Sequence, residues 1–159
     1  MKRYRFQLTG IVSAYVVTIA AFAQTPKDFD ACRIFTAADA ESTLGSPVVQ
    51  EPVNSKVKPK VILTCKYTAT SGDARFAMVT FRFARNAEEA KSAYSESRLE
   101  LRGKPTIISG RDANWNEKQG QLNLLSGNAW LVIDAGPSEA KARDSAVAKK
   151  LAETLIPKL

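Results

Sequence analysis

The stretch "QLNLLSGNAWLVI" (residues 121–133) has the pattern of two short strands joined by a tight turn. Its Gly-Asn dipeptide favours the backbone conformation of a two-residue hairpin loop. Such a loop pairs Leu124 with Leu131 and Leu122 with Ile133, which places these four side chains on one face. Because strands joined by a tight hairpin run antiparallel, the chain is expected to contain an antiparallel sheet.

A second hairpin is predicted upstream, from the apolar segments at residues 61–69 and 75–83. Strict alternation turns one set of their side chains, including Cys65, toward the core. The opposite register of both hairpins is unusually apolar for a face in contact with water. We predict that this second face binds a ligand or partner through five side chains, namely Phe76, Met78, Leu125, Trp130 and Val132.

Capping signals and helical periodicity predict three helices. A short helix begins at Thr36, with Asp39 in the capping-box position. Asn86 caps a second helix that ends by Gly103, and apolar residues at helical spacing predict a third over residues 138–156.

The resulting order is helix, hairpin, helix, an optional short strand with a hairpin, and helix. The optional strand is "TIIS", residues 106–109. This pattern predicts an α+β domain with an antiparallel sheet of four to five strands and helices collected on one face.

The first 23 residues have the pattern of a cleaved secretory signal. A basic start is followed by an apolar segment and an Ala-x-Ala site before Gln24. We therefore expect residues 24–159 to form one exported domain, periplasmic or secreted, without a transmembrane span; retention of the signal as an anchor is the alternative. Removing three basic residues lowers the net charge of the chain from +7 to +4.

The two cysteines are best explained as one disulfide. Asp28, Phe29 and Asp30 separate Cys32 from the signal segment, which argues against a lipid anchor. The chain has no C-x-x-C motif and no histidine, so two thiols cannot complete a zinc site. In an exported chain, a Cys32–Cys65 bond is expected, and a free reactive thiol is the alternative.

The composition removes several classes of function. Without histidine the chain has no Ser-His-Asp or Cys-His catalysis and no histidine-ligated metal or haem. No stripe of basic and aromatic residues supports nucleic-acid binding. Neither a cofactor nor a metal site is predicted. Lys56, Lys58 and Lys60 form a basic loop, whose alternative role is binding of an anionic envelope polymer.

Two weaker patterns suggest enzyme chemistry. Asp112 and Glu117 flank Trp115 and form a candidate loop site for a sugar or peptide. Ser138 and Lys141 match S-x-x-K, as do residues 55–58, but the K-T-G element that accompanies this motif is absent. The corresponding hypothesis is a small hydrolase or transferase that uses Asp112/Glu117 or Ser138/Lys141.

Several short elements together resemble small secreted or lipid-anchored bacterial envelope domains of unknown function. These elements are a cysteine before a capped helix that ends in Leu-Gly-x-Pro (residues 32–47), Cys-x-Tyr on a strand (65–67), and G-x-D-A-x-W (110–115). The resemblance implies an exported α+β domain with a disulfide and brings no catalytic residues. The first hypothesis is therefore a non-catalytic binding domain whose partner is an envelope protein, a peptide or a lipid-like ligand.

Overall fold

The computed structural model describes residues 29–52, 61–71 and 74–159. Its helices are α1 (Ala31–Ile34), α2 (Ala37–Leu44), α3 (Ala87–Glu100) and α4 (Ser145–Leu155), with the 3-10 turns η1 (Ala140–Ala142) and η2 (Ile156–Lys158). The strands are β1 (Val48–Glu51), β2 (Val61–Ala69), β3 (Arg75–Phe83), β4 (Lys104–Ile108), β5 (Arg111–Asn116), β6 (Gln121–Ser126) and β7 (Ala129–Pro137).

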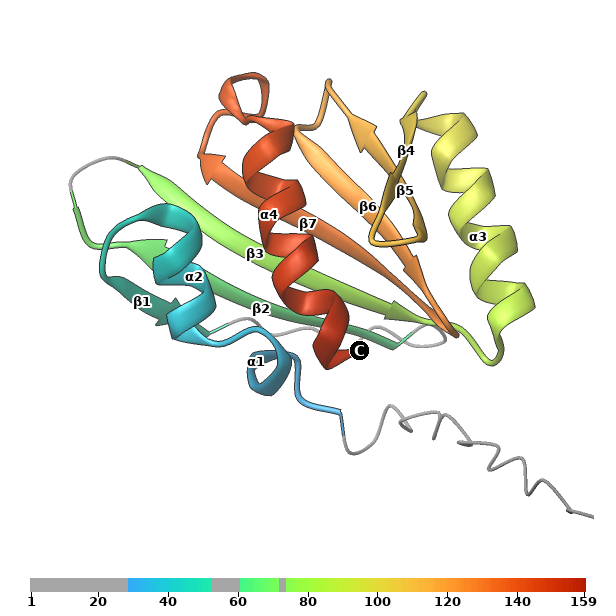
Figure 1. The fold of residues 1–159 in the computed structure, drawn as a ribbon, viewed down its shortest axis with the longest axis horizontal. Helices are drawn as coiled ribbons and strands as arrows, with labels where there is room; N and C mark the ends of the chain where they lie inside the picture. Colours follow the sequence, from blue (N-terminus) through green and yellow to red (C-terminus); the bar gives the residue numbers. More distant parts are fainter. Residues whose placement is uncertain (1–28, 53–60, 72–73) are drawn as a thin grey trace, which may run out of the picture.

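One antiparallel sheet contains all seven strands, in the order β1-β2-β3-β7-β6-β5-β4 (Figure 1). Two runs of consecutive strands, β1–β3 and β4–β7, meet where β3 pairs with β7 over nine residue pairs. The predicted register is confirmed, since Leu124 pairs with Leu131 and Leu122 with Ile133.

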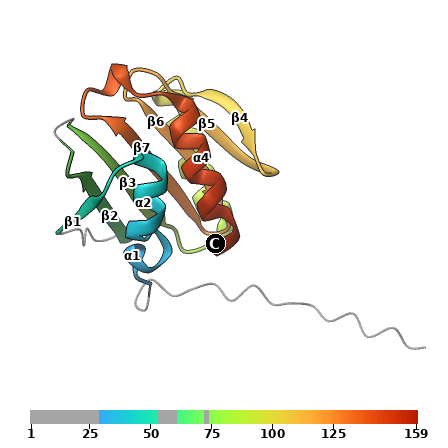
Figure 2. The ribbon, with the colours of Figure 1, turned by 60° about the vertical axis from the view of Figure 1, so that its left-hand side comes forward.

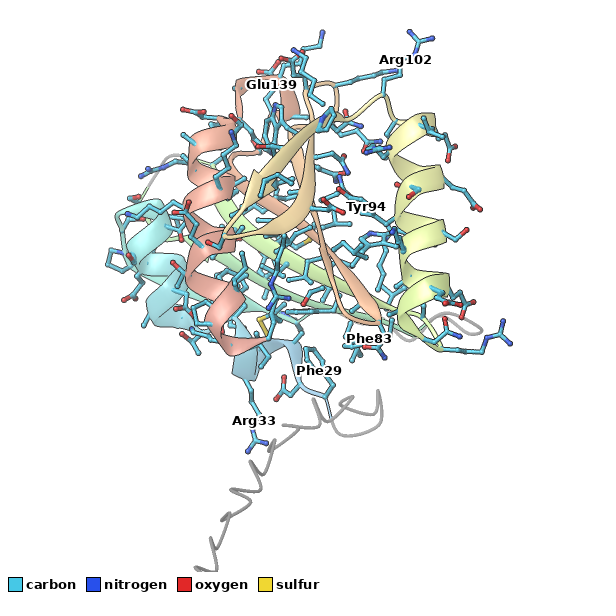
Figure 3. The ribbon with its side chains drawn as sticks, turned by 45° about the vertical axis from the view of Figure 1, so that its right-hand side comes forward. Phe29, Arg33, Phe83, Tyr94, Arg102 and Glu139 are labelled. Atoms are coloured by element: carbon cyan, nitrogen blue, oxygen red, sulfur yellow. A yellow bond between two sulfur atoms is a disulfide. The ribbon has the colours of Figure 1, made fainter. Side chains whose placement is uncertain are left out.

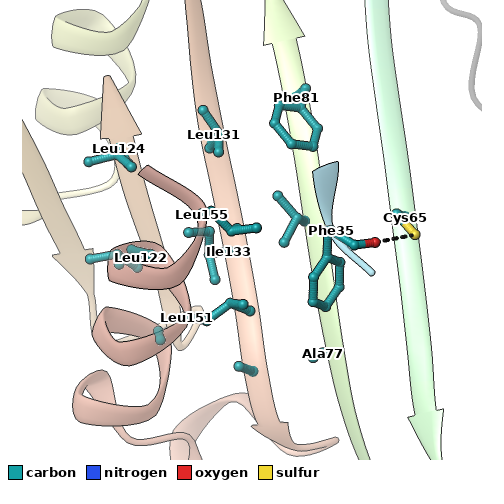
Figure 4. Packing of buried hydrophobic residues seen from close by; sticks show 14 of the residues in the cluster. Phe35, Cys65, Ala77, Phe81, Leu122, Leu124, Leu131, Ile133, Leu151 and Leu155 are labelled. Carbon is teal, nitrogen blue, oxygen red and sulfur yellow. Dashed lines mark hydrogen bonds between the residues drawn. The ribbon is translucent and has the colours of Figure 1, made fainter. Parts of the chain in front are cut away.

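The main core lies between one face of the sheet and a layer formed by α1, α2 and α4 (Figure 2). From α4, Leu151 and Leu155 pack over Leu131 and Ile133 of β7 (Figure 4). All four side chains are fully buried. This face, termed the core face, carries the apolar register that the sequence predicts.

The α+β class and the antiparallel sheet are confirmed, but the prediction of four to five strands is wrong. The additional strands are β1 and β5. β1 is a four-residue edge strand, too short for its alternation to stand out from a loop. β5 ("RDANWN") contains most of the predicted loop site. Its polar sequence suggests a turn before the last hairpin, yet Asn114 and Asn116 are buried in a strand.

Helices also cover both faces of the sheet, not one. α3 packs on β6 and β7 from the side opposite to α4 (Figure 3). The reason is the connection it makes. Four antiparallel steps separate β3 from β4, so these two strands run in the same direction, and a chain joining them must cross back over one face.

The last helix begins later than expected, at Ser145 instead of residue 138. Asp144 is its N-cap and accepts a hydrogen bond from the backbone N–H of Ala146, 2.8 Å long. Residues 138–144 form a loop with the short turn η1, which is held by Arg143. Near the start of the fold, the Thr36–Asp39 capping box and the left-handed Gly45 (φ 69°) are as predicted.

The predicted disulfide joins Cys32 of α1 to Cys65 of β2. Cys65 is fully buried on the core face, and its Sγ lies 3.6 Å from the carbonyl oxygen of Phe35 (Figure 4). Tyr67, two residues along β2, donates a hydrogen bond of 3.3 Å to the same carbonyl. The disulfide therefore holds the N-terminal helices against the sheet. The predicted signal segment, residues 1–23, lies outside the described residues.

We expect the double replacement Cys32→Ala/Cys65→Ala to lower the free energy of unfolding by about 3–4 kcal/mol, because the disulfide closes a loop with a sequence separation of 33. Urea unfolding of the oxidised, the reduced and the doubly substituted protein measures the effect. The reduced protein should match the variant. Equal midpoints for the oxidised and reduced forms would contradict this role.

Candidate functional site: the second face of the sheet

The predicted binding face lies on the side of the sheet opposite to the core face, but α3 covers part of it. Trp130 and Val132 of β7 pack against Tyr94 of α3 and are only 7% and 6% exposed. Leu125 of β6 lies half-buried beside them. Figure 3 shows Tyr94 directed from α3 toward the strands. These three predicted binding residues therefore belong to a second, smaller core.

Polar side chains interrupt the contact between α3 and the sheet. Tyr94 Oη lies close to the side chain of Asn114. Two other buried atoms there, Asn123 Nδ2 and Trp130 Nε1, have no hydrogen-bond partner within the described part of the chain. Burial raises the pKa of the Tyr94 phenol above its ordinary value, while the hydrogen bond with Asn114 opposes that rise. Each unpaired buried polar group costs about 1–3 kcal/mol, so α3 is held less firmly than a purely apolar contact would hold it.

Phe76 of β3 lies at the other end of this face, between two cations. The ammonium of Lys66 is 5.2 Å from the centre of its ring, and the guanidinium of Arg143 is 4.8 Å from it. Lys66 is in turn paired with Glu51 of β1 at 2.6 Å. The loop that carries Arg143 thus reaches round to the second face and covers Phe76 in part.

Arg143 is anchored by a buried ion pair with Asp134 of β7. The Nη1–Oδ1 distance is 2.6 Å, and the two side chains are 9% and 3% exposed. Arg143 also donates hydrogen bonds to the carbonyl oxygens of Gln119, Pro137 and Ser138. Burial raises the pKa of the Asp134 carboxyl, while hydrogen bonds from Gln121 and Arg143 and the charge of Arg143 oppose that rise.

Among the described residues, no helix or loop covers the rest of the second face, which β1, β2 and β3 form. We call it the open half and define it by six residues: Val49, Ile62, Thr64, Lys66, Met78 and Arg82. Cross-strand pairs Ile62–Arg82 and Lys66–Met78 place these side chains next to one another. Val49 is 58% exposed at the edge strand, and Met78 is half-buried.

A crevice of about 70 Å³ separates α3 from the open half. Ile62, Arg82, Ala93 and Trp130 are among the residues that line it. Arg82 stacks on Trp130, with its guanidinium 5.2 Å from the ring centre, and forms no salt bridge within residues 29–52, 61–71 and 74–159. An exposed cation beside an apolar strip is suited to a partner that carries a carboxylate.

The predicted loop site is divided between the two faces. Asp112 points to the second face, because its strand neighbours Ala113 and Trp115 belong to the opposite register. Trp115 packs against the main core, and Glu117 forms an exposed salt bridge of 2.6 Å with Lys104. The structure therefore does not bring Asp112 and Glu117 together around Trp115.

Ser138 and Lys141 are both exposed in the loop before α4, and no hydrogen bond between them is found in the described part of the chain. The backbone N–H of Ser138 donates to the carbonyl of Ala74, 2.8 Å away. Ser138 is not the N-cap of the last helix, since Asp144 has that role. The second S-x-x-K match and the basic loop, residues 55–60, lie outside the described residues.

Sequence reasoning did not identify Arg82, Arg143 or Asp134 as parts of this region. Arg82 had a signal, because it lies in the same period-two register as Phe76 and Met78. Asp134 and Arg143 lie on either side of a loop, and only the fold brings them together. Among the described residues there is no group of three or more acidic or cysteine side chains that could hold a metal ion, and no helix long and apolar enough to cross a membrane.

Comparison of the chain with protein-family models, with curated proteins and with solved structures finds no match in any of the three.

Trp130→Ala is expected to cost about 3–5 kcal/mol of unfolding free energy, because it empties the contact beneath α3. Met78→Ala should cost less than about 1 kcal/mol, because none of the described helices packs on Met78, which is half-buried. Chemical denaturation of the two variants measures the difference. Equal losses would show that the open half is as much a part of the core as Trp130 is.

We expect Arg143→Met to lower the unfolding free energy by about 3–5 kcal/mol, since it leaves the Asp134 carboxylate buried and unpaired. The loss should be smallest near pH 4 and grow toward neutral pH: a raised carboxyl pKa gives stability that disappears as pH rises through the folded-state value. Denaturation at several pH values tests this. The double variant Asp134→Leu/Arg143→Met should recover most of the loss, and a pH-independent loss would contradict the explanation.

Proposed function

We propose that the protein is an exported, non-catalytic binding domain of the bacterial cell envelope, and that its open half binds an extended, acidic segment of another polypeptide. The leader pattern of residues 1–23 and the disulfide support export, since disulfides persist in oxidising compartments. The resemblance to envelope domains is in keeping with this proposal.

One observation carries the binding site: the helix α3 and the loop 138–144 cover the second face only in part. In the described structure they leave the half-buried side chains of Ile62 and Met78 without a covering helix. Arg82, which pairs with Ile62 across the two strands, has no acidic partner there. In a sheet that carries helices on both faces, the apolar parts of each face are normally covered. The uncovered part is therefore available to a partner.

The shape of the open half favours a polypeptide over a small molecule. Its crevice of about 70 Å³ is far smaller than the roughly 300–1,000 Å³ of pockets that enclose drug-sized ligands. A strand-like segment lying across β1–β3 meets a surface with two basic side chains, Lys66 and Arg82, and one edge strand. Backbone groups at that edge and the alternating side chains of the face are the features that extended peptides use for recognition.

The proposal is tested by placing a photo-crosslinking amino acid at position 78 in the native envelope. We expect a crosslinked polypeptide that disappears when Arg82→Glu is added, because the acidic partner is then repelled. Position 107 is the matched control: Ile107 is 64% exposed on the same face, but on β4 at the opposite edge of the sheet.

Crosslinks from position 107 to the same polypeptide, or crosslinks from position 78 that persist in the Arg82→Glu variant, would refute the proposed site. Thermal unfolding of each variant confirms that the fold is retained. The predicted enzyme reactions and the binding of anionic polymers by the basic loop have no specific support in the geometry described above, and they stay predictions.

A further inference from the structure

A second, larger cavity opens at one end of the core face. It has a volume of about 580 Å³, within the range of small-molecule sites. Its lining comes from the ends of β3 and β7, the β6–β7 turn, the start of α3 and both ends of the described chain. It lies on the face opposite to the open half, so it is a separate site.

The cavity exists because the helical layer is shorter than the sheet. The nine residues of β3 extend about 30 Å, whereas the eleven residues of α4 extend about 16 Å. α4 therefore covers the middle of the core face and ends before the last residues of β3. Figure 3 shows Phe29 and Phe83 at this end of the molecule, with Arg102 and Glu139 at the other.

The floor of the cavity is aromatic and aliphatic. Phe29 contacts Phe81 and Phe83 edge-on, with ring centres 4.8 Å apart in each case, and Leu131 continues the apolar surface on β7. Phe81 and Leu131 are already buried (1% and 0% exposed), so the apolar surface open to the cavity comes mainly from Phe29, which is half-buried, and from Leu159, which is 41% exposed. Burying this surface gains about 25 cal/mol per Å², which stabilises an alkyl chain placed against it.

The rim of the cavity is basic. Arg85, Arg111 and Lys158 line it, and no acidic side chain of the described residues does. Lys158 is neutralised by Asp39 at 2.6 Å, and Arg85 is bonded to Glu89 at 3.1 Å. Arg85 is 89% exposed, and such a surface pair contributes little.

Arg111 differs from the other two cations. It lies on β5 in the register of the core face, half-buried, and donates to the hydroxyl of Ser126. It forms no salt bridge in the described part of the chain. A half-buried guanidinium beside an apolar cavity is an unused partner for an anion. The N-terminal end of α3, at Asn86 and Ala87, also lines the cavity and adds a positive dipole.

We propose that this cavity binds a single-chain amphiphile with an anionic head, such as a fatty acid. Its alkyl chain lies against Phe29 and Leu159, above the buried rings of Phe81 and Phe83, and its carboxylate pairs with Arg111 and Arg85. The ligand follows from the combination of apolar side chains inside the cavity with a basic rim, on which Arg111 forms no salt bridge in the described part of the chain. No polypeptide bound to the open half is required.

Isothermal titration calorimetry with sodium dodecanoate, below its micelle concentration, tests this on the exported chain. We expect one dodecanoate site per chain, and binding at least about tenfold weaker in Arg111→Gln. The cationic analogue dodecyltrimethylammonium should bind the unchanged protein at least about tenfold more weakly than dodecanoate does. Arg102→Gln is the matched control, because Arg102 is exposed at the other end of the molecule. It should bind as the unchanged protein does.

A second variant keeps the test sound if Arg111→Gln unfolds. Arg85→Gln alters an 89% exposed side chain, so the fold is retained, and it should weaken binding about threefold or more. Absence of dodecanoate binding overturns the proposal, including the case in which another part of the chain or a second copy fills the cavity. The proposal is also overturned if both arginine variants bind dodecanoate as tightly as the unchanged protein does. A protein that sediments with phosphatidylglycerol vesicles but does not bind free dodecanoate overturns it as well.

Discussion

The pairing of β3 with β7 is the constraint on which the rest of the structure depends. It joins two runs of consecutive strands that are otherwise separate, and it does so over nine residue pairs in the middle of the sheet. Once β3 is central, the chain that leaves it must reach the far edge, where β4 lies. The strands between them are about 4.8 Å apart, so the crossing covers about 19 Å. The fourteen residues of α3 span about 21 Å, which is enough to cross the sheet or to return along it. Because α1, α2 and α4 occupy the core face, α3 takes the second face.

Local signals in the sequence predicted what local chemistry controls. The Gly-Asn turn sets the pairing of Leu124 with Leu131, and the Thr36–Asp39 capping box starts α2 as expected. The leader pattern and the presence of only two cysteines were enough to predict the disulfide, and the inward register of Cys65 agreed with it. The failures concern long-range features. The apolar character of Trp130 and Val132 indicated a covered face as much as a binding face, and only the direction in which α3 crosses the sheet separates the two meanings. β5 was missed because its buried asparagines make a core strand look like a turn.

The two helices that flank the sheet differ in how firmly they are held. α4 buries four side chains, Ala148, Leu151, Ala152 and Leu155, in a continuous apolar contact. α3 buries only Ala90 and Tyr94, and it meets polar side chains of the sheet, of which Asn123 Nδ2 and Trp130 Nε1 lack hydrogen-bond partners in the described structure. Unpaired groups and small apolar contacts place an element at the low end of local stability. The disulfide acts on the opposite side, where it fastens α1 to β2. The strongest constraints are therefore on the core face, and the weakest contact borders the open half.

Both proposed sites lie beside the point where β3 ends and α3 begins. Phe83, the last residue of β3, lines the crevice on the second face as well as the cavity on the core face. This coincidence has a physical cause. A chain that leaves the centre of a sheet needs its next residues for the connection, so they cannot extend either helical layer over the strand end. α4 stops short of this end, and α3 begins beyond it. At this end the apolar strand residues are covered by single side chains, Phe29 on one face and Trp130 on the other, more than by a helix. The nearby arginines, Arg111 on the core face and Arg82 on the second face, make each region suited to an acidic ligand. The same topology that fills the middle of the sheet thus leaves its end open for binding.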